Sequence, residues 1–175
     1  MENGADRTVA APADRELHQC ISALLPDLRG FARFLTRDAV TADDLVQDTL
    51  VRALAAMDQF QPGTNLKAWL FTIQRNAFYE QARRRRRETR VLSERLPDPD
   101  STVPDAARRS DVSDLQRMLF GLPPLLREAL VLVGAQELSY EQAASICGVP
   151  VGTVKARVSR ARSQLARTLA TGGPH

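Results

Sequence analysis

The segment Ser93–Asp114 limits what this chain of 175 residues can fold into. It holds three prolines and five aspartates and lacks any apolar period, so it is expected to be a flexible linker. The pieces on either side, about 90 and about 60 residues long, can each fold but can bury little apolar surface alone. The sequence therefore predicts a disordered tail at residues 1–15 and two small domains, at residues 16–92 and 115–170.

Apolar residues recur at steps of three and four along both pieces, which is the spacing of amphipathic helices. Glu16–Thr36 follows this pattern, and Pro26 is expected to kink that helix or to begin a new one. A second helix is expected after Thr41, with Thr41 as its N-cap, and a third from about Leu66. The predicted fold class is all-α.

The second piece carries the signals of a helix-turn-helix. Two short helices, Leu115–Phe120 and Leu125–Val133, are expected first. Ser139 and Gln142 then have the spacing of a capping box, and Gly148 is placed to end the helix that they begin. A further helix follows at once, so two helices joined by a glycine-containing turn are predicted.

Composition excludes several classes of protein. With 43% hydrophobic and 26% charged residues, wholesale disorder and collagen-like or disulfide-scaffold folds are not expected. No apolar run reaches the ~18–20 residues of a membrane span, and the N-terminus lacks a signal-peptide core, so a cytoplasmic location without membrane contact is expected. Cys20 and Cys147 lie far apart, and each is expected to be a small buried apolar residue.

The sequence also speaks against an enzyme. His18 and His175 are its only histidines, and no cluster has the spacing of metal ligands or of a catalytic centre. We therefore expect no metal, no cofactor and no small-molecule substrate. A nuclease or recombinase with an attached helix-turn-helix is the enzyme class that this argues against.

Charge alternates along the chain, although the net charge is only +3. Residues 1–60 hold 6 basic and 10 acidic residues, and residues 61–96 hold 9 and 3. Residues 97–114 hold 2 basic and 5 acidic residues, and residues 115–175 hold 7 and 3. Two separate surfaces could therefore attract a polyanion.

The first basic surface follows a cluster of aromatic residues. Arg83–Arg87 is too densely charged to be buried, and phosphate is its natural ligand. Aromatic rings beside arginine suit unstacked bases, and we assign this role to Phe78 and Tyr79, since packing is expected to claim others. An RNA-binding or membrane-surface patch is the alternative for the arginine run.

An acidic face is expected on the second helix, with Asp44, Gln47, Asp48 and Val51. Asp48 stands four residues before Arg52, so the two can form an ion pair. Spacing alone favours a solvated face, and a docking surface for a basic or polar partner is the alternative.

The last helix carries the second basic surface. Residues near the start of such a helix reach base edges in the major groove, and we assign Lys155 and Ser159 to these edges. Small side chains there would let the backbone approach DNA, whereas the arginines suit phosphate contacts. The small residues are Gly152, Ala156 and Ser159, and the arginines are Arg157, Arg160 and Arg162. A basic helix that merely packs is the alternative.

Four motifs together resemble the extracytoplasmic-function sigma factors of the bacterial sigma-70 family. They are Asp43-Asp-Leu-Val-Gln-Asp-Thr, Asn65-Leu-Lys-Ala-Trp-Leu-Phe-Thr-Ile-Gln-Arg-Asn, the arginine run, and Ser139-Tyr-Glu-Gln-Ala-Ala through Gly152-Thr-Val-Lys-Ala-Arg-Val-Ser-Arg-Ala-Arg. The amino-acid sequences of these motifs are most similar to those of the general-stress-response subgroup. The resemblance covers residues ~20–90 and ~115–168, so it includes both predicted domains.

The resemblance implies a sigma region 2 bundle, a region 4 helix-turn-helix and three sets of contacts. Those to the clamp of the polymerase β′ subunit are Asp43, Asp44, Gln47, Asp48 and Arg52. Those to the unpaired −10 element are Asn65, Lys67, Arg75, Asn76, Tyr79, Arg83, Arg84 and Arg86. Those to the −35 duplex are Gly152, Thr153, Lys155, Ala156, Arg157, Ser159, Arg160 and Arg162, with Ala156 where the family commonly has serine.

The function implied is promoter recognition on behalf of core RNA polymerase, through its β′ clamp and β flap. The resemblance also implies a small anti-sigma factor as inhibitor. Two other functions stay open from the residues: a helix-turn-helix regulator that works without polymerase, and a decoy that only binds an anti-sigma factor. A regulator of the first kind predicts palindromic half-sites, whereas a sigma factor predicts two unlike elements.

Overall fold

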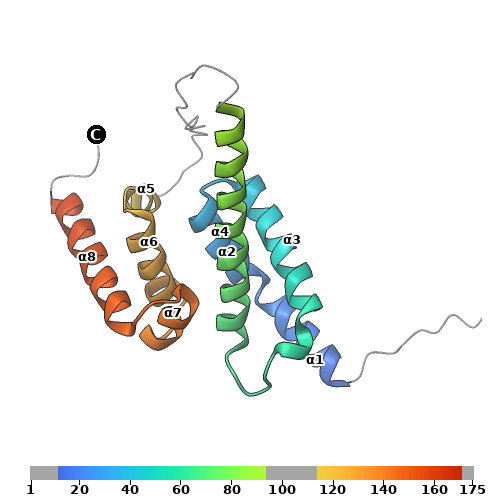
Figure 1. The fold of residues 1–175 in the computed structure, drawn as a ribbon. Helices are drawn as coiled ribbons and strands as arrows, with labels where there is room; N and C mark the ends of the chain where they lie inside the picture. The colour runs from blue at the N-terminus through green and yellow to red at the C-terminus, as the bar shows by residue number, and fades with distance from the viewer. Residues whose placement is uncertain (1–11, 94–113, 171–175) are drawn as a thin grey trace, which may run out of the picture.

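The computed structural model describes residues 12–93 and 114–170 (Figure 1). Most of the expected tail (residues 1–15) and of the expected linker (residues 93–114) lies outside these ranges, as do residues 171–175, whereas residues 12–15 of the expected tail are helical. Every regular element within them is a helix, which confirms the all-α prediction. The elements are α1 (Pro12–Ala23), α2 (Leu25–Thr36), α3 (Ala39–Ala55), η1 (Met57–Gln59), α4 (Leu66–Ser93), α5 (Asp114–Phe120), α6 (Pro124–Leu130), the π-helical segment η2 (Val131–Ala135), α7 (Tyr140–Cys147) and α8 (Val151–Ala170).

The N-terminal domain, α1–α4, is a bundle in which α2 packs on both α3 and α4. Its core is formed by side chains that are fully buried, and Phe31 of α2 stacks on Phe71 of α4 with ring centroids 4.7 Å apart. Such a ring pair contributes about 1 kcal/mol beyond the burial of its area. Leu28, Leu45 and Leu70 fill the space around the two rings.

Two helix starts in this domain can be compared with the sequence prediction. A new helix does begin next to Pro26, which stands in the first turn of α2. Thr41, however, is not the N-cap of α3. Asp38 takes that position, since its carboxylate accepts hydrogen bonds from the Thr41 backbone N–H at 2.8 Å and from the Thr41 hydroxyl at 2.7 Å. These hydrogen bonds lower the pKa of Asp38.

Helix α4 runs without a break from the centre of the bundle to the arginine run. It starts after a turn in which Gly63 has a φ of +87°, a conformation that favours glycine. Ala77 and Gln74 of α4 are fully buried, whereas Arg83–Arg87 are exposed. The same helix therefore supplies core and cationic surface.

The C-terminal domain, α5–α8, contains the predicted helix-turn-helix. The Ser139 hydroxyl accepts from the Gln142 backbone N–H at 3.1 Å, and the Gln142 side chain accepts from the Ser139 backbone N–H at 2.9 Å, so the capping box is confirmed. Gly148 ends α7 with a φ of 65°. Val154 and Val158 of α8 are buried where α8 packs on α6 and α7. Their burial fixes the rotation of α8 about its axis.

The two domains pack against each other, which the sequence did not indicate. Helix α7 lies against α4, and α6 with η2 lies against α2, while α8 packs on the outer side of α6 and α7 (Figure 1). Cys147 of α7 is buried, as expected. Cys20 of α1 is exposed, so that expectation was wrong for it: the next residue, Ile21, occupies the buried position on this turn of α1.

Removing the capping box should destabilise the C-terminal domain. We expect Ser139→Ala to lower the free energy of unfolding by about 1 kcal/mol, because the Gln142 N–H loses its acceptor. Urea unfolding followed by circular dichroism measures this. Ser163→Ala, at an exposed position in the middle of α8, serves as the control and should change stability by less than about 0.5 kcal/mol. Equal effects of the two substitutions would contradict the role of the cap.

Candidate nucleic-acid and polymerase interfaces

The candidate duplex-binding surface is the outer face of α8. Most of its predicted residues are exposed: Gly152, Lys155, Ala156, Ser159, Arg160 and Arg162. The Lys155 ammonium lies 5.7 Å from the centre of the Tyr140 ring, which holds it near the start of the helix. This face therefore presents small side chains and exposed cationic groups, the combination that a major groove accepts.

Arg157 is placed differently from its neighbours. It is half-buried, and its Nη1 is buried without a hydrogen-bond partner within the described ranges. Its charge acts on Tyr79 of α4 and on Cys147, so its side chain lies on the side of α8 that faces the domain interface. Thr153 is also partly buried.

The predicted −10 residues fall into two groups. Asn76, Arg83, Arg84 and Arg86 are exposed on α4. Asn65 is exposed too, but its side chain accepts from the Ala68 backbone N–H at 3.0 Å and thereby caps α4. The other three residues, Lys67, Arg75 and Tyr79, lie where the C-terminal domain packs on α4.

Arg75 forms a buried ion pair with Glu128 of α6. Its Nε donates to Glu128 Oε1 at 2.7 Å and its Nη2 to Oε2 at 3.3 Å. The side chains are 16% and 1% exposed. Burial alone would lower the pKa of Arg75, but the hydrogen bond and charge of Glu128 outweigh it and raise this pKa. The pair joins the two domains.

Two further contacts surround this ion pair. The Arg75 guanidinium lies 4.6 Å from the centre of the Tyr79 ring, and burial, followed by the charge of Glu128, raises the pKa of Tyr79. Lys67 Nζ donates to the main-chain oxygen of Gln136 at 3.0 Å and pairs with Asp27 at 3.0 Å. Three predicted DNA contacts are therefore engaged within the protein.

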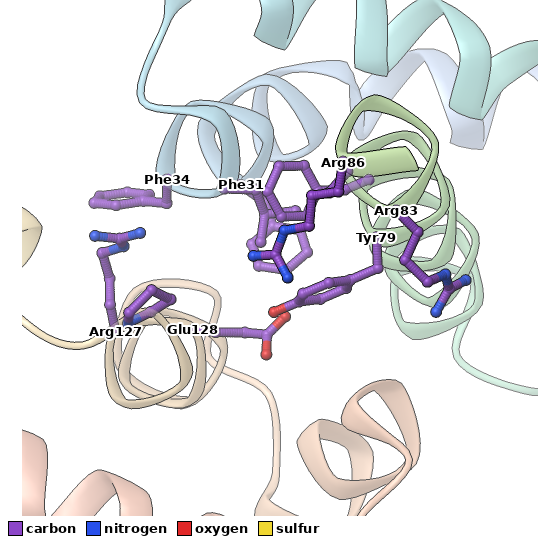
Figure 2. A pocket seen from close by; sticks show the side chains of 11 residues that line it. Phe31, Phe34, Tyr79, Arg83, Arg86, Arg127 and Glu128 are labelled. Carbon is purple, nitrogen blue, oxygen red and sulfur yellow. The ribbon is translucent and has the colours of Figure 1, made fainter. Parts of the chain in front are cut away.

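A cavity of about 250 Å³ adjoins the ion pair, between α2, α4 and α6 (Figure 2). Tyr79 points across it toward Glu128, and Phe34 faces Arg127. Arg127 is 6% exposed, and its Nη1 donates to the Phe120 carbonyl at 3.3 Å. Burial, and next the charge of Arg37, lowers the pKa of Arg127. Sequence reasoning missed Arg127 and Glu128, which no local pattern distinguishes from other charged residues.

The acidic face of α3 is also divided. Asp43, Asp44 and Gln47 are exposed and have the apolar Val40 and Val51 near them on the same helix, 71% and 66% exposed. Exposed apolar side chains mark a protein-binding surface where they form a larger patch, so Val40 and Val51 make this face a candidate docking surface.

The remaining two residues of that face are bound to α4. The Arg52 guanidinium pairs with Asp48 at 3.0 Å and with Glu80 at 2.7 Å, and Gln81 donates to Asp48 at 3.1 Å. The hydrogen bonds to Asp48 and Glu80 raise the pKa of Arg52. The predicted pair between Asp48 and Arg52 is therefore present within α3, and the contacts of these two residues with Glu80 and Gln81 fasten α3 to α4.

Comparison with known proteins identifies the chain. Residues 20–88 match the family described as "Sigma-70 region 2", and residues 113–165 match "Sigma-70, region 4". The "ECF RNA polymerase sigma factor EcfG" of Rhodopseudomonas palustris is 48% identical, over 93% of this chain and 90% of the relative. The chain belongs to the extracytoplasmic-function sigma factors of the sigma-70 family. The resemblance inferred from the motifs is thereby confirmed, and the protein is not an enzyme.

Other relatives and solved structures agree. The ECF RNA polymerase sigma factor SigC of Mycobacterium tuberculosis is 36% identical, over 86% of this sigma factor and 82% of the relative. The sigma factor RpoE of Bartonella quintana, solved with the anti-sigma factor NepR, matches with a TM-score of 0.75 and 44% identity over 90% of this chain and 99% of that one. CnrH, solved with the cytosolic domain of CnrY, matches with a TM-score of 0.66 and 29% identity over 91% of both chains.

The described part of this sigma factor contains no helix that is both long and apolar enough to span a membrane. Residues 12–93 and 114–170 also contain no group of three or more potential metal-ligating side chains.

The rate at which the Cys147 thiol reacts reports whether the domain interface is closed. Burial, and next the charge of Glu128, raises the pKa of the Cys147 thiol to about 11. Only the thiolate reacts, so at pH 8 a Cys20→Ser variant should react with a thiol reagent about 100-fold more slowly than a free cysteine with the usual pKa. Reaction with a chromogenic disulfide measures the rate.

The reciprocal variant provides the control. Cys147→Ser leaves the exposed Cys20, which should react rapidly. Denaturing the Cys20→Ser variant should restore a rapid reaction of Cys147. If Cys147 of the folded chain reacted as fast as Cys20, the thiol could not be buried at the interface.

Proposed function

We propose that this sigma factor directs core RNA polymerase to promoters through three surfaces. In the N-terminal domain, at residues 16–92, the acidic face of α3 docks on the β′ clamp and α4 captures the unpaired −10 strand. In the C-terminal domain, at residues 115–170, α8 reads the −35 duplex and the domain contacts the β flap. The chain works in the cytoplasm, and its similarity to EcfG supports a role in a stress response.

The observation that carries this proposal is the nature of the residues in the domain interface. Lys67, Arg75 and Tyr79 are two cations and an aromatic ring, the groups that bind phosphates and stack on unpaired bases. Their partners in the structure are the Glu128 carboxylate and the Gln136 carbonyl, which offer oxygen acceptors as a phosphate does. Binding of −10 DNA therefore requires the domains to separate.

The interface is suited to separation. A buried ion pair adds little net stability, because desolvation of both charges offsets most of their attraction. When the domains separate, Arg75 and Glu128 both regain water, so opening avoids the large cost of leaving one buried charge unpaired. The closed arrangement is specific without being strongly bound.

We also propose that a small anti-sigma factor binds this chain. The similar sigma factors RpoE and CnrH were each solved with an anti-sigma factor or its domain, and both matches extend over nine-tenths of this chain, thus over both domains. An inhibitor that prefers the closed arrangement would keep Lys67, Arg75 and Tyr79 from DNA.

In vitro transcription tests the proposal. Purified protein is added to core polymerase with a library of promoter fragments, and specific transcripts are identified by sequencing. Transcripts that start at a fixed distance from two unlike elements support a sigma factor. Absence of any specific transcript, with no inhibitor present, would overturn the proposal, and palindromic binding sites would favour a regulator that works without polymerase.

Asp44→Arg should block docking on polymerase. Asp44 is exposed and has no part in the ion pairs that join α3 to α4, so the substitution reverses charge on the surface without disturbing the bundle. We expect the affinity for core polymerase to fall about tenfold or more, measured by fluorescence anisotropy. Asp58→Arg, exposed but outside this face, is the control. The docking assignment fails if both variants bind like the wild type.

Lys155→Ala should impair reading of the −35 element. Lys155 is exposed near the start of α8, and loss of one base contact costs about 1–3 kcal/mol, or about tenfold in promoter use. Transcription from a promoter with an intact −35 element measures the effect. Binding to core polymerase should stay unchanged, and undiminished transcription would refute the assignment of Lys155.

A further inference from the structure

Packing of the two domains covers the two DNA-binding surfaces unequally. On α4, the covered residues are Arg75, whose side chain is 16% exposed, and Lys67, whose side chain is 22% exposed, together with Tyr79. On α8, the matching set is open: of eight predicted contacts, only Thr153 and Arg157 are partly buried. The single-strand surface is masked, and the duplex surface is not.

The position of α8 explains this difference. Helix α8 packs on α6 and α7, and these two helices stand between it and the N-terminal domain (Figure 1). Its buried residues, Val154, Val158 and Ala161, point toward α6 and α7, so the opposite face is directed away from α4. Closure of the domains therefore leaves room for a DNA duplex beside α8.

We propose that the closed chain is itself a duplex-DNA-binding protein, which uses the face of α8 while its single-strand surface is masked. The inference rests on the proposed function, since it concerns the same two surfaces. It adds that duplex binding needs neither polymerase nor opening of the domains. Only Arg157, which is turned inward, would join the duplex surface on opening.

Linkage gives this proposal a clear consequence. A ligand with equal affinity for the closed and open chain cannot shift the balance between them, however tightly it binds. Single-stranded DNA competes with Glu128 for Arg75 and must favour the open chain. Duplex DNA gains only the Arg157 contact when the domains separate, so it should shift the balance far less than the single strand does.

Gly30 provides a way to open the interface without changing a DNA contact. It lies on α2, and a Cβ atom built on it would be 3.7 Å from Nε2 of Gln136 in the C-terminal domain. Gly30→Ala therefore fits in ordinary contact. The longer side chain of Gly30→Gln would push against Gln136 and force the domains apart. Both hydrophobic cores stay intact, because Gly30 is only half-buried.

Glu128→Gln opens the interface from the other side by removing the charge that holds Arg75. Glu88→Gln is its matched control. Glu88 pairs with Arg84 at 2.9 Å on the exposed part of α4, away from the C-terminal domain. Each substitution removes one negative charge and releases one arginine of the DNA surface, so an increase in DNA affinity common to both variants reflects these two effects. The surplus in Glu128→Gln reflects unmasking of the rest of the surface.

The experiment measures DNA binding by fluorescence anisotropy without polymerase. The probes are a mixed-sequence single strand of about 12 nucleotides and a mixed-sequence duplex of about 20 base pairs. Relative to Gly30→Ala, we expect Gly30→Gln to bind the single strand about tenfold more tightly. Affinity for the duplex should change by no more than about threefold, because only Arg157 is added. The arginine run is common to all variants, and of its members Arg83 and Arg86 line the cavity between the domains, so they form part of the surface that opening unmasks.

Two further measurements complete the test. In the otherwise unchanged chain, Arg160→Ala should weaken duplex binding, since Arg160 is assigned as an exposed phosphate contact on α8. The slope of the logarithm of the binding constant against the logarithm of the salt concentration should fall by about one, because one counterion fewer is released on binding. In a Cys20→Ser background, the single strand should speed the reaction of Cys147 with a thiol reagent, whereas the duplex should leave it slow.

Several results would overturn the inference. A duplex affinity that rises tenfold in Gly30→Gln would show that α8 is masked too. Single-strand affinity that stays constant while Cys147 becomes reactive would show that α4 is not masked. Cys147 that stays unreactive in both Gly30→Gln and Glu128→Gln would show that these contacts do not hold the domains together. Since polymerase is absent, these results are independent of the transcription assay.

Discussion

The ion pair between Arg75 and Glu128 determines how the two domains lie together. Each side chain comes from a different domain, and each would be an uncompensated buried charge if its partner were removed. The pair therefore aligns α6 on α4, and the other interface contacts follow from that alignment: Lys67 reaches Gln136, and Tyr79 lies against the Arg75 guanidinium. Because opening hydrates both charges, the pair sets the geometry without making it permanent.

Helix α4 connects the fold to the function. Its buried residues hold the N-terminal bundle, its Arg75 and Lys67 hold the C-terminal domain, and its arginine run stays in solvent. The aromatic pair of Phe31 and Phe71 anchors the first turns of α4 on α2, and the continuous helix carries the cations further along. A ligand of Lys67, Arg75 and Tyr79 is therefore in competition with the C-terminal domain.

The sequence predicts well those features that depend only on residues close together in the chain. The capping box of Ser139 and the left-handed Gly148 depend on residues within a few positions, and both are present. Asp38 was missed because Thr41, three residues on, satisfies the same compositional rule, and only the hydrogen bonds decide between them. Glu128 lies 53 residues from Arg75, across the linker, and no periodicity connects such a pair.

Electrostatic repulsion opposes the packing of the two domains, because both carry an excess of basic residues. Helix α4, with 8 basic and 2 acidic residues, meets helices of the C-terminal domain, which holds 7 basic and 4 acidic residues over residues 114–170, so two cationic units are brought together. Glu128 offsets this at one point, while Arg157 keeps a buried nitrogen without a partner in the described chain. Salt screens repulsion between exposed charges far more than it weakens a buried pair. Salt therefore weakens DNA binding and at the same time favours the closed chain. Both effects oppose binding of the unpaired −10 strand by the free sigma factor.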